Sequence, residues 1–272
     1  MVTDNFKKIR LSLLYFPVVL LSFVILFLYE YDALSTGSYV QIQKNTFLFL
    51  NSKLSQYPVL EYNLTQLGDA LVILSLLSVF IVYIPAIWEN LLSALLVSTV
   101  CSVVLKELFA VPRPAAVFDH NSFVIIGKTL TGHNSLPSGH SITISTILTV
   151  VLFAFMPRKL IYKIMWYSVV FVVGFILVST RVGVGAHYPL DITIGSIIGY
   201  LSGVLGIFIN QKHKLCAWVN NKKYYPVFIV LFVIGIVLTL NRITNENLVI
   251  FYISLAGLMI SLYIIARKYV EE

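Results

Sequence analysis

Long apolar runs, separated by shorter polar stretches, make up most of this chain. Eight of these runs approach or reach the length of about 20 residues that a helix needs to cross a bilayer. They cover residues 11–29, 70–87, 91–105, 141–156, 164–179, 191–209, 226–240 and 248–265. Because only helices and closed barrels satisfy their backbone hydrogen bonds in lipid, the pattern predicts an all-α, polytopic transmembrane helical bundle of about eight spans.

The first apolar run is a candidate signal peptide because it lies near the start of the chain. No small-residue cleavage site follows residues 11–29, so we expect a retained membrane anchor. In the mixed loop that comes next, residues 47–54 read Phe-Leu-Phe-Leu-Asn-Ser-Lys-Leu and predict a helix lying in the membrane interface. We therefore divide the chain into an N-terminal span with its interfacial loop (residues 1–69), a core (70–209), and a basic loop with two C-terminal spans (210–272).

Composition supports the membrane assignment. The chain is 58% hydrophobic and 11% charged, with a mean hydropathy of +0.90, whereas a soluble domain carries about 25% charged residues. The net charge of +7 would suit a nucleic-acid partner. The basic residues flank apolar runs, however, which is the pattern that orients membrane proteins, so we expect a bilayer and no nucleic acid as the partner. Cys101 and Cys216 have no metal-site spacing and predict no disulfide.

The distribution of lysine and arginine predicts the orientation in the membrane. Eight spans place both termini on one side, and 12 of the 19 basic residues flank that side: Lys7, Lys8, Arg10, Arg158, Lys159, Lys163, Lys212, Lys214, Lys222, Lys223, Arg267 and Lys268. Under the positive-inside rule both termini are therefore cytoplasmic. The loops at residues 106–140 and 181–191 then share the outer face, where they can form one site.

The stretch over residues 181–191 carries the strongest candidate chemistry. It reads Arg-Val-Gly-Val-Gly-Ala-His-Tyr-Pro-Leu-Asp and lies between two apolar runs, where ionisable groups are costly. Pro189 fits the first turn of a helix, so His187 and Asp191 lie one turn apart on the same face. The aspartate can hold one imidazole nitrogen and leave the other facing a substrate. Arg181 offers a planar guanidinium suited to phosphate oxygens.

Two further segments meet this stretch on the same face. One runs from Lys106 to Arg113, and the other is Pro-Ser-Gly-His at residues 137–140. Since the cations outnumber the anions we expect an anionic ligand, and phosphate suits arginine and lysine best. The backbone N–H groups of Ser138 and Gly139 lie at a predicted helix start, where an anion is also favoured.

Together these residues suit phosphoryl transfer. We expect His187 to act as the nucleophile and form a phosphohistidine, with Asp191 orienting it. His140 would protonate the leaving oxygen and then activate water. The non-bridging oxygens would be held by Lys106, Arg113, Ser138, Gly139 and Arg181. The His-x3-Asp pair could instead bind a metal, but the nearby cations disfavour a cationic guest.

The three segments resemble the type 2 phosphatidic acid phosphatase superfamily, the lipid phosphate phosphatases that share an active site with vanadium haloperoxidases. Its motifs are Lys-x6-Arg-Pro, Pro-Ser-Gly-His and Ser-Arg-x5-His-x3-Asp. They are matched here by Lys106, Arg113 and Pro114, by Pro137 to His140, and by Arg181, His187 and Asp191. Thr180 stands where the family usually has serine, a change that keeps a hydroxyl. The resemblance covers residues 70–209.

The resemblance implies a six-helix phosphatase core with its site at the outer leaflet, and a metal-independent phosphohistidine mechanism that uses no cofactor. The expected function is hydrolysis of a lipid phosphate or diphosphate at the periplasmic face of a bacterial inner membrane. Undecaprenyl diphosphate or a lipid A phosphate is favoured by analogy. Phosphatidylglycerophosphate and phosphatidic acid are alternative substrates. Phosphotransfer to an alcohol, or transport of an anion or lipid, are alternative functions.

Overall fold

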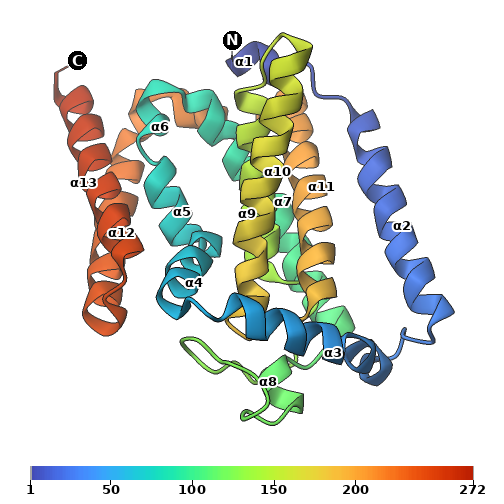
Figure 1. Cartoon of the computed structure of the whole chain (residues 1–272). Helices are drawn as coiled ribbons and strands as arrows, with labels where there is room; N and C mark the ends of the chain where they lie inside the picture. The colour runs from blue at the N-terminus through green and yellow to red at the C-terminus, as the bar shows by residue number, and fades with distance from the viewer. Residues whose placement is uncertain (1, 272) are drawn as a thin grey trace.

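The chain folds into helices joined by short connections (Figure 1). The computed structural model describes residues 2–271, and in that range it contains no strand. The α-helices are α1 (Val2–Phe6), α2 (Tyr15–Glu30), α3 (Thr36–Leu54), α4 (Pro58–Thr65), α5 (Ala70–Leu77), α6 (Phe80–Tyr83), α7 (Pro85–Phe109), α8 (Pro114–Val117), α9 (Gly139–Ala154), α10 (Leu160–Gly183), α11 (Pro189–His213), α12 (Tyr225–Glu246) and α13 (Val249–Val270). Short 3-10 helices are η1 (Leu11–Leu14), η2 (Gln66–Gly68), η3 (Ala217–Asn220) and η4 (Lys222–Tyr224). The predicted all-α, polytopic class is confirmed.

Six segments are long and apolar enough to cross a membrane, and α9 is apolar but shorter. The six are Leu11–Glu30, Pro85–Val117, Leu160–Gly183, Pro189–His213, Lys222–Glu246 and Val249–Val270. The prediction of one continuous span over residues 70–87 is wrong, because this run is divided between α5, α6 and the start of α7 at Pro85. A proline disfavours the helical conformation in the residue before it. Ile84, which precedes Pro85, accordingly leaves the helix with φ −139° and ψ 66°.

The long helices run alternately between two ends of the molecule. Figure 1 shows the N- and C-termini at one end, while α3, α8 and the loop before α9 lie at the other. Both termini therefore lie at the same end of the bundle, opposite the polar segments singled out in the sequence.

Close packing of α11 against α9 brings two of those segments together. Gly195, Gly199 and Gly203 recur every four residues along the face of α11 that meets α9. A side-chain carbon at Gly195 would lie 2.8 Å from the carbonyl oxygen of Ser138, so only glycine permits this approach. As a result the N-terminal ends of α9 and α11 lie in contact, and the Ser138 N–H donates a 3.1 Å hydrogen bond to the Asp191 carbonyl.

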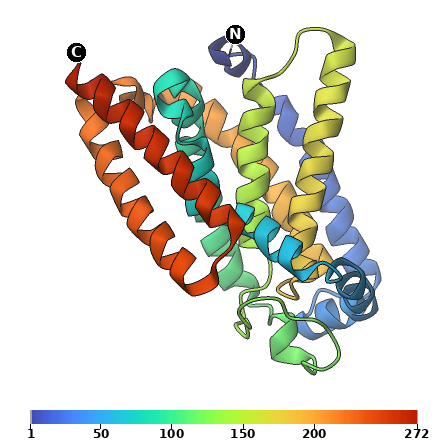
Figure 2. The ribbon, with the colours of Figure 1, turned by 60° about the vertical axis from the view of Figure 1, so that its left-hand side comes forward.

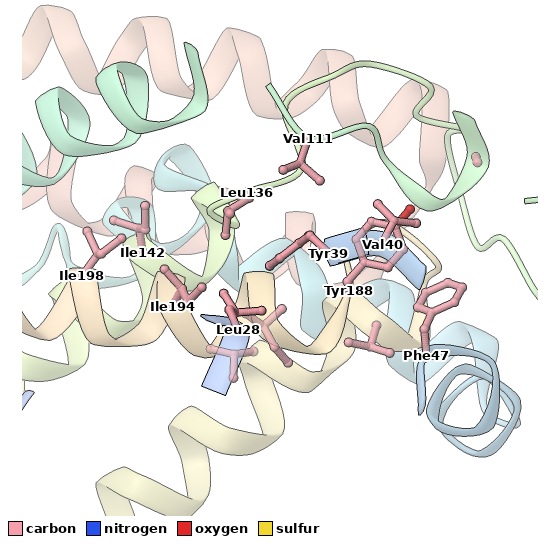
Figure 3. Close-up of a cluster of buried hydrophobic side chains, with 14 of the residues drawn as sticks. Leu28, Tyr39, Val40, Phe47, Val111, Leu136, Ile142, Tyr188, Ile194 and Ile198 are labelled. Atoms are coloured by element: carbon pink, nitrogen blue, oxygen red, sulfur yellow. The ribbon is translucent and has the colours of Figure 1, made fainter. Parts of the chain in front are cut away.

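Helix α3 lies across the end of the bundle that carries the polar loops (Figure 1). It is longer than the interfacial helix predicted over residues 47–54, and it presents a buried stripe to the bundle at every fourth position: Tyr39, Gln43, Phe47 and Asn51. Figure 3 shows Phe47, Tyr39 and Tyr188 within one buried cluster, and the Phe47 and Tyr188 rings are 5.6 Å apart between centroids. Helix α3 is therefore a cap on the core as well as a candidate interfacial element.

Helices α12 and α13 form an antiparallel hairpin at the side of the bundle (Figure 2). It is fastened to α5 by a hydrogen bond of 2.7 Å between the Ser78 and Ser261 hydroxyls. An ion pair of 3.0 Å joins Arg242 to Asp69, the residue that caps α5. The hairpin thus holds the segment that precedes α5, which borders the polar end of α9.

Candidate active site

Four helix ends meet where the polar loops converge, and local sequence fixes how two of them begin. Pro189 starts α11, and the Asp191 carboxylate accepts the Tyr188 N–H at 3.0 Å, which is one half of a capping box. At the start of α9, the Ser138 hydroxyl accepts the Ser141 N–H at 3.3 Å as an N-cap. Both helix starts are therefore held in place by their own side chains.

His187 lies between an aspartate and an arginine, with 1% of its surface exposed. Its Nδ1 is 3.4 Å from Asp191 Oδ2, and its Nε2 is 3.3 Å from Arg113 Nη1. A guanidinium only donates hydrogen bonds, so Nε2 must be the acceptor. The proton of the neutral ring therefore lies on Nδ1, facing Asp191, and the Nε2 lone pair faces the cationic side of the site.

The protonation state of His187 follows from its surroundings. Burial lowers the pKa of its imidazole well below the ordinary value of 6.5, and the positive charges of Arg113, Arg181 and Lys106 lower it further. At neutral pH the ring is thus uncharged and its lone pair is available. The same effect shows that all three predicted cations lie close enough to act on this ring.

Asp191 is fully buried and receives three hydrogen bonds. Besides the Tyr188 N–H, the Tyr39 hydroxyl donates to Oδ1 at 2.7 Å, and the Ser135 hydroxyl donates to Oδ2 at 2.6 Å. Ser135 Oγ is also 3.4 Å from His187 Nδ1. Two hydroxyls therefore fix the carboxylate that orients the histidine, and the sequence motifs include neither of them. No spacing links Tyr39 to the other residues, while Ser135 directly precedes the Leu-Pro-Ser-Gly-His segment.

The two arginines are buried and only partly satisfied. Arg113 donates from Nε to the Asn134 side chain at 2.8 Å and from Nη1 to the Ala186 carbonyl at 3.2 Å. Arg181 donates from Nη1 to the Thr65 hydroxyl at 2.6 Å, but its buried Nε–H has no partner in the described chain. An unpaired buried donor on a cation is costly, and an anion bound beside it would relieve that cost.

The remaining predicted site residues surround the start of α9. A side-chain carbon at Gly139 would lie 3.1 Å from Lys106 Nζ, so the ammonium sits against the Gly139 backbone. His140 is half-buried and packs against Gly68. The Ser138 N–H donates to the Asp191 carbonyl, and the Ser138 hydroxyl accepts from the Ser141 N–H as the cap of α9. Phosphate binding by Ser138 stays a prediction, and the group that could donate to phosphate is its hydroxyl.

The structure thus brings Arg113, His187 and Asp191 into direct contact and places Lys106 and Arg181 within electrostatic range of them. Among the residues described, no three His, Cys, Asp or Glu side chains gather in a way that could hold a metal ion. The arrangement therefore offers an uncharged nucleophile, an orienting carboxylate and several cationic donors. Such a set suits attack on a phosphorus atom.

Comparison with known proteins agrees with this chemistry. Residues 88–215 match the family model described as PAP2 superfamily. The crystal structure of Aquifex aeolicus LpxE is similar to this chain, with 26% sequence identity and a TM-score of 0.51. That match covers 61% of this chain and 95% of the LpxE chain. No curated protein matches the sequence.

Proposed function

Since residues 88–215 belong to the PAP2 superfamily, we propose that this chain is an integral-membrane lipid phosphatase that works through a phosphohistidine at His187. The observation that carries the proposal is the orientation of the His187 ring. Its protonated nitrogen faces Asp191, and its lone pair faces Arg113. A nucleophile held by a carboxylate and aimed at a cationic site is the arrangement that covalent phosphoryl transfer requires.

In the first step the Nε2 lone pair of His187 attacks the phosphorus of the lipid phosphate. The new P–N bond forms as the P–O bond to the lipid breaks. The leaving oxygen takes a proton from His140, so the lipid departs as a neutral alcohol. Asp191 stabilises the positive charge that develops on the His187 ring, and its own position is held by Tyr39 and Ser135.

In the second step a water molecule attacks the phosphohistidine. His140, which has lost its proton to the lipid, accepts a proton from this water, and the P–N bond breaks to release inorganic phosphate. The cycle ends as it began, with His140 protonated and His187 neutral. In the empty site burial and the charges of Arg181, Arg113 and Lys106 lower the pKa of His140 well below 6.5. His140 therefore takes up its proton together with the anionic phosphate, whose charge offsets those of the cations. Each step therefore balances without a metal or an external acid.

The cations stabilise the charge that spreads over the non-bridging oxygens in both steps. Lys106 and the Gly139 N–H would act from the start of α9, Arg113 from beside His187, and Arg181 through its unpaired Nε–H. Donors of this kind, fixed before the substrate arrives, contribute several kcal/mol to a transition state, about 3 to 4 for one oxyanion-hole donor. Arg113 would exchange its bond to His187 Nε2 for a phosphate oxygen on binding.

The substrate is expected to be a phosphorylated lipid of a bacterial envelope, with the site facing the periplasm of the inner membrane and both termini facing the cytoplasm. Two observations support this orientation. The site and the termini lie at opposite ends of the bundle (Figure 1), and most lysines and arginines flank the end that carries the termini.

The test uses the full chain purified in detergent and a panel of lipid phosphates. We expect the wild-type protein to release inorganic phosphate with a chelator present, and His187→Ala to release none while it still folds and inserts. A phosphohistidine trapped by alkaline quench should be absent from His187→Ala. Turnover by His187→Ala contradicts the assigned nucleophile, and loss of activity with the chelator contradicts the metal-free mechanism.

The same assay separates the alternative functions. A phosphotransferase would yield a phosphorylated acceptor alcohol in place of free phosphate. A transporter would move phosphate or lipid across vesicles while hydrolysing neither. Either result replaces hydrolysis as the function of this site.

A further inference from the structure

A polar pocket of about 250 Å³ opens beside His140, on the side of α9 that faces α7 and η2. The lining residues that carry the argument are Gly68, Asp69, Thr99, Ser102, His140 and Thr143. The nucleophile His187 is not among them.

The pocket is continuous with the proposed phosphate site. Ser102 and Lys106 lie one turn apart on α7, and both approach Gly139 at the start of α9. A side-chain carbon at Gly139 would be 3.1 Å from Lys106 Nζ and 3.7 Å from Ser102 Oγ. A phosphate held by Lys106 and Gly139 would therefore have the pocket directly next to it.

Three of the four hydroxyl-bearing residues that line this pocket are free to bind a ligand; the fourth, Ser98, donates to the Leu95 carbonyl at 3.0 Å. Elsewhere in the spans, Ser22 and Ser196 donate to the carbonyl four residues earlier in their own helix. Thr99, Ser102 and Thr143 make no hydrogen bond with any described residue. Uncommitted hydroxyls on membrane-spanning helices that line a cavity mark a place where a polar group is accommodated.

The charge of the pocket decides which polar group fits. Asp69 is its only acidic residue, and both of its oxygens are occupied. Oδ1 accepts the N–H groups of Leu71 and Val72, and Oδ2 pairs with Arg242 at 3.0 Å. No lysine or arginine is among the lining residues described. With Lys106 already holding the first phosphate, a second phosphate group would have no cation of its own among the lining residues described. Hydroxyls, which both donate and accept hydrogen bonds, suit a hydroxyl-bearing group.

We propose that this pocket receives the leaving group, and that this group is a neutral polyol, namely a sugar or glycerol unit with a free hydroxyl near the phosphate ester. The inference rests on the proposed function, because it takes His140 as the acid that protonates the leaving oxygen. The atoms attached to that oxygen must then lie beside His140, where the pocket is. The proposal narrows the substrate class to phosphate monoesters on a hydroxyl-bearing headgroup. It disfavours a polyprenyl diphosphate, because the leaving group of that substrate is itself a phosphate.

The experiment compares kcat/KM of the full chain in detergent for three substrates of matched chain length: a diacyl glucosamine phosphate, an alkyl monophosphate without hydroxyls, and a polyprenyl diphosphate. Thr143→Val removes a hydroxyl at nearly constant volume, and Ser102→Ala removes a second. Thr193→Val is the matched control, because its hydroxyl bonds only to the Pro189 carbonyl of its own helix, on another face of the bundle.

We expect the wild-type protein to prefer the sugar phosphate. The ratio of its kcat/KM to that of the alkyl phosphate should fall by about three- to tenfold in Thr143→Val and in Ser102→Ala, the range for one lost hydrogen bond. Thr193→Val should leave the ratio unchanged. The polyol pocket is overturned if the diphosphate is hydrolysed with the same kcat/KM as the sugar phosphate. It is also overturned if both substitutions leave the ratio of kcat/KM values unchanged while phosphate is still released. Either result leaves the proposed phosphatase function standing. Release of phosphate from no lipid overturns both.

Discussion

The Tyr39 hydroxyl donates a 2.7 Å hydrogen bond to Asp191, a residue 152 positions later in the chain. Burial and the charge of Asp191 raise the pKa of Tyr39 well above its usual value, so the phenol remains a donor at any working pH. Tyr39 lies on α3, outside residues 88–215 that match the family model. The N-terminal segment therefore contributes directly to the site and does more than anchor it.

Removing this donor should weaken catalysis more than binding. In Tyr39→Phe the Asp191 carboxylate loses one of its two hydroxyl donors and can turn away from His187. A hydrogen bond to a charged group contributes about 1.5–3 kcal/mol, so we expect kcat to fall by roughly ten- to a hundredfold with a smaller change in KM. Steady-state kinetics on purified protein measures both.

Tyr188→Phe is the matched control for that variant. Tyr188 is also buried near Asp191, but its hydroxyl has no hydrogen-bond partner in the described chain. Its loss should leave kcat within about twofold and should not lower the melting temperature, because no bond is broken. Equal losses in the two variants would mean that Tyr39 acts through packing.

A substitution at Gly68 should disturb His140 without changing any polar group. A side-chain carbon there would lie 2.7 Å from His140 Cβ and from Cδ2, closer than real contacts allow, so the ring must move. Because small misplacements of catalytic groups cost about a hundredfold, Gly68→Ala should reduce kcat by at least tenfold. Gly37→Ala on α3, where no atom lies within 4 Å, should retain full activity.

The bond between Thr65 and Arg181 offers a test by double-mutant cycle. Arg181→Lys keeps the charge but loses the unpaired Nε–H and the fork geometry, so kcat/KM should fall by about ten- to a hundredfold. Thr65→Val removes the 2.6 Å partner of Nη1 and should cost less, about three- to tenfold. In the Arg181→Lys background, Thr65→Val should add little. Additive losses would show that Thr65 acts on another group.

The low pKa of His187 predicts the acid limb of the pH profile. The neutral ring is the form that the proposed mechanism requires as nucleophile, and burial with three neighbouring cations lowers the pKa of His187 well below 6.5. We therefore expect kcat/KM to be insensitive to this group above pH 6.5 and to fall only at more acidic pH. Since the unfolded chain binds the proton more readily, the free energy of unfolding should also decrease as pH falls below 6.5. A wild-type acid limb centred above 6.5 would contradict a neutral, buried His187.

The sequence predicted the helical class and the residues of the motifs, because both depend on local information. Apolar runs of fixed length mark helices in lipid, and the spacing of His187 and Asp191 on one helix places them one turn apart regardless of the rest of the fold. The same local information failed at Pro85, where a continuous apolar run concealed a helix break. It also gave no sign that the Ser138 N–H has a partner on another helix, the Asp191 carbonyl.

Which distant groups complete the proposed site depends on how the helices pack together. Tyr39 and Thr65 reach Asp191 and Arg181 from helices that carry no motif. Hydrogen bonds of this kind depend on how α3 and α4 pack over the bundle, which no periodicity in the sequence encodes. Local motifs were enough to identify the proposed nucleophile His187 and its cations Lys106, Arg113 and Arg181. The hydroxyls that hold Asp191 and Arg181, and the pocket beside His140, depend on how helices that are distant in the sequence pack together.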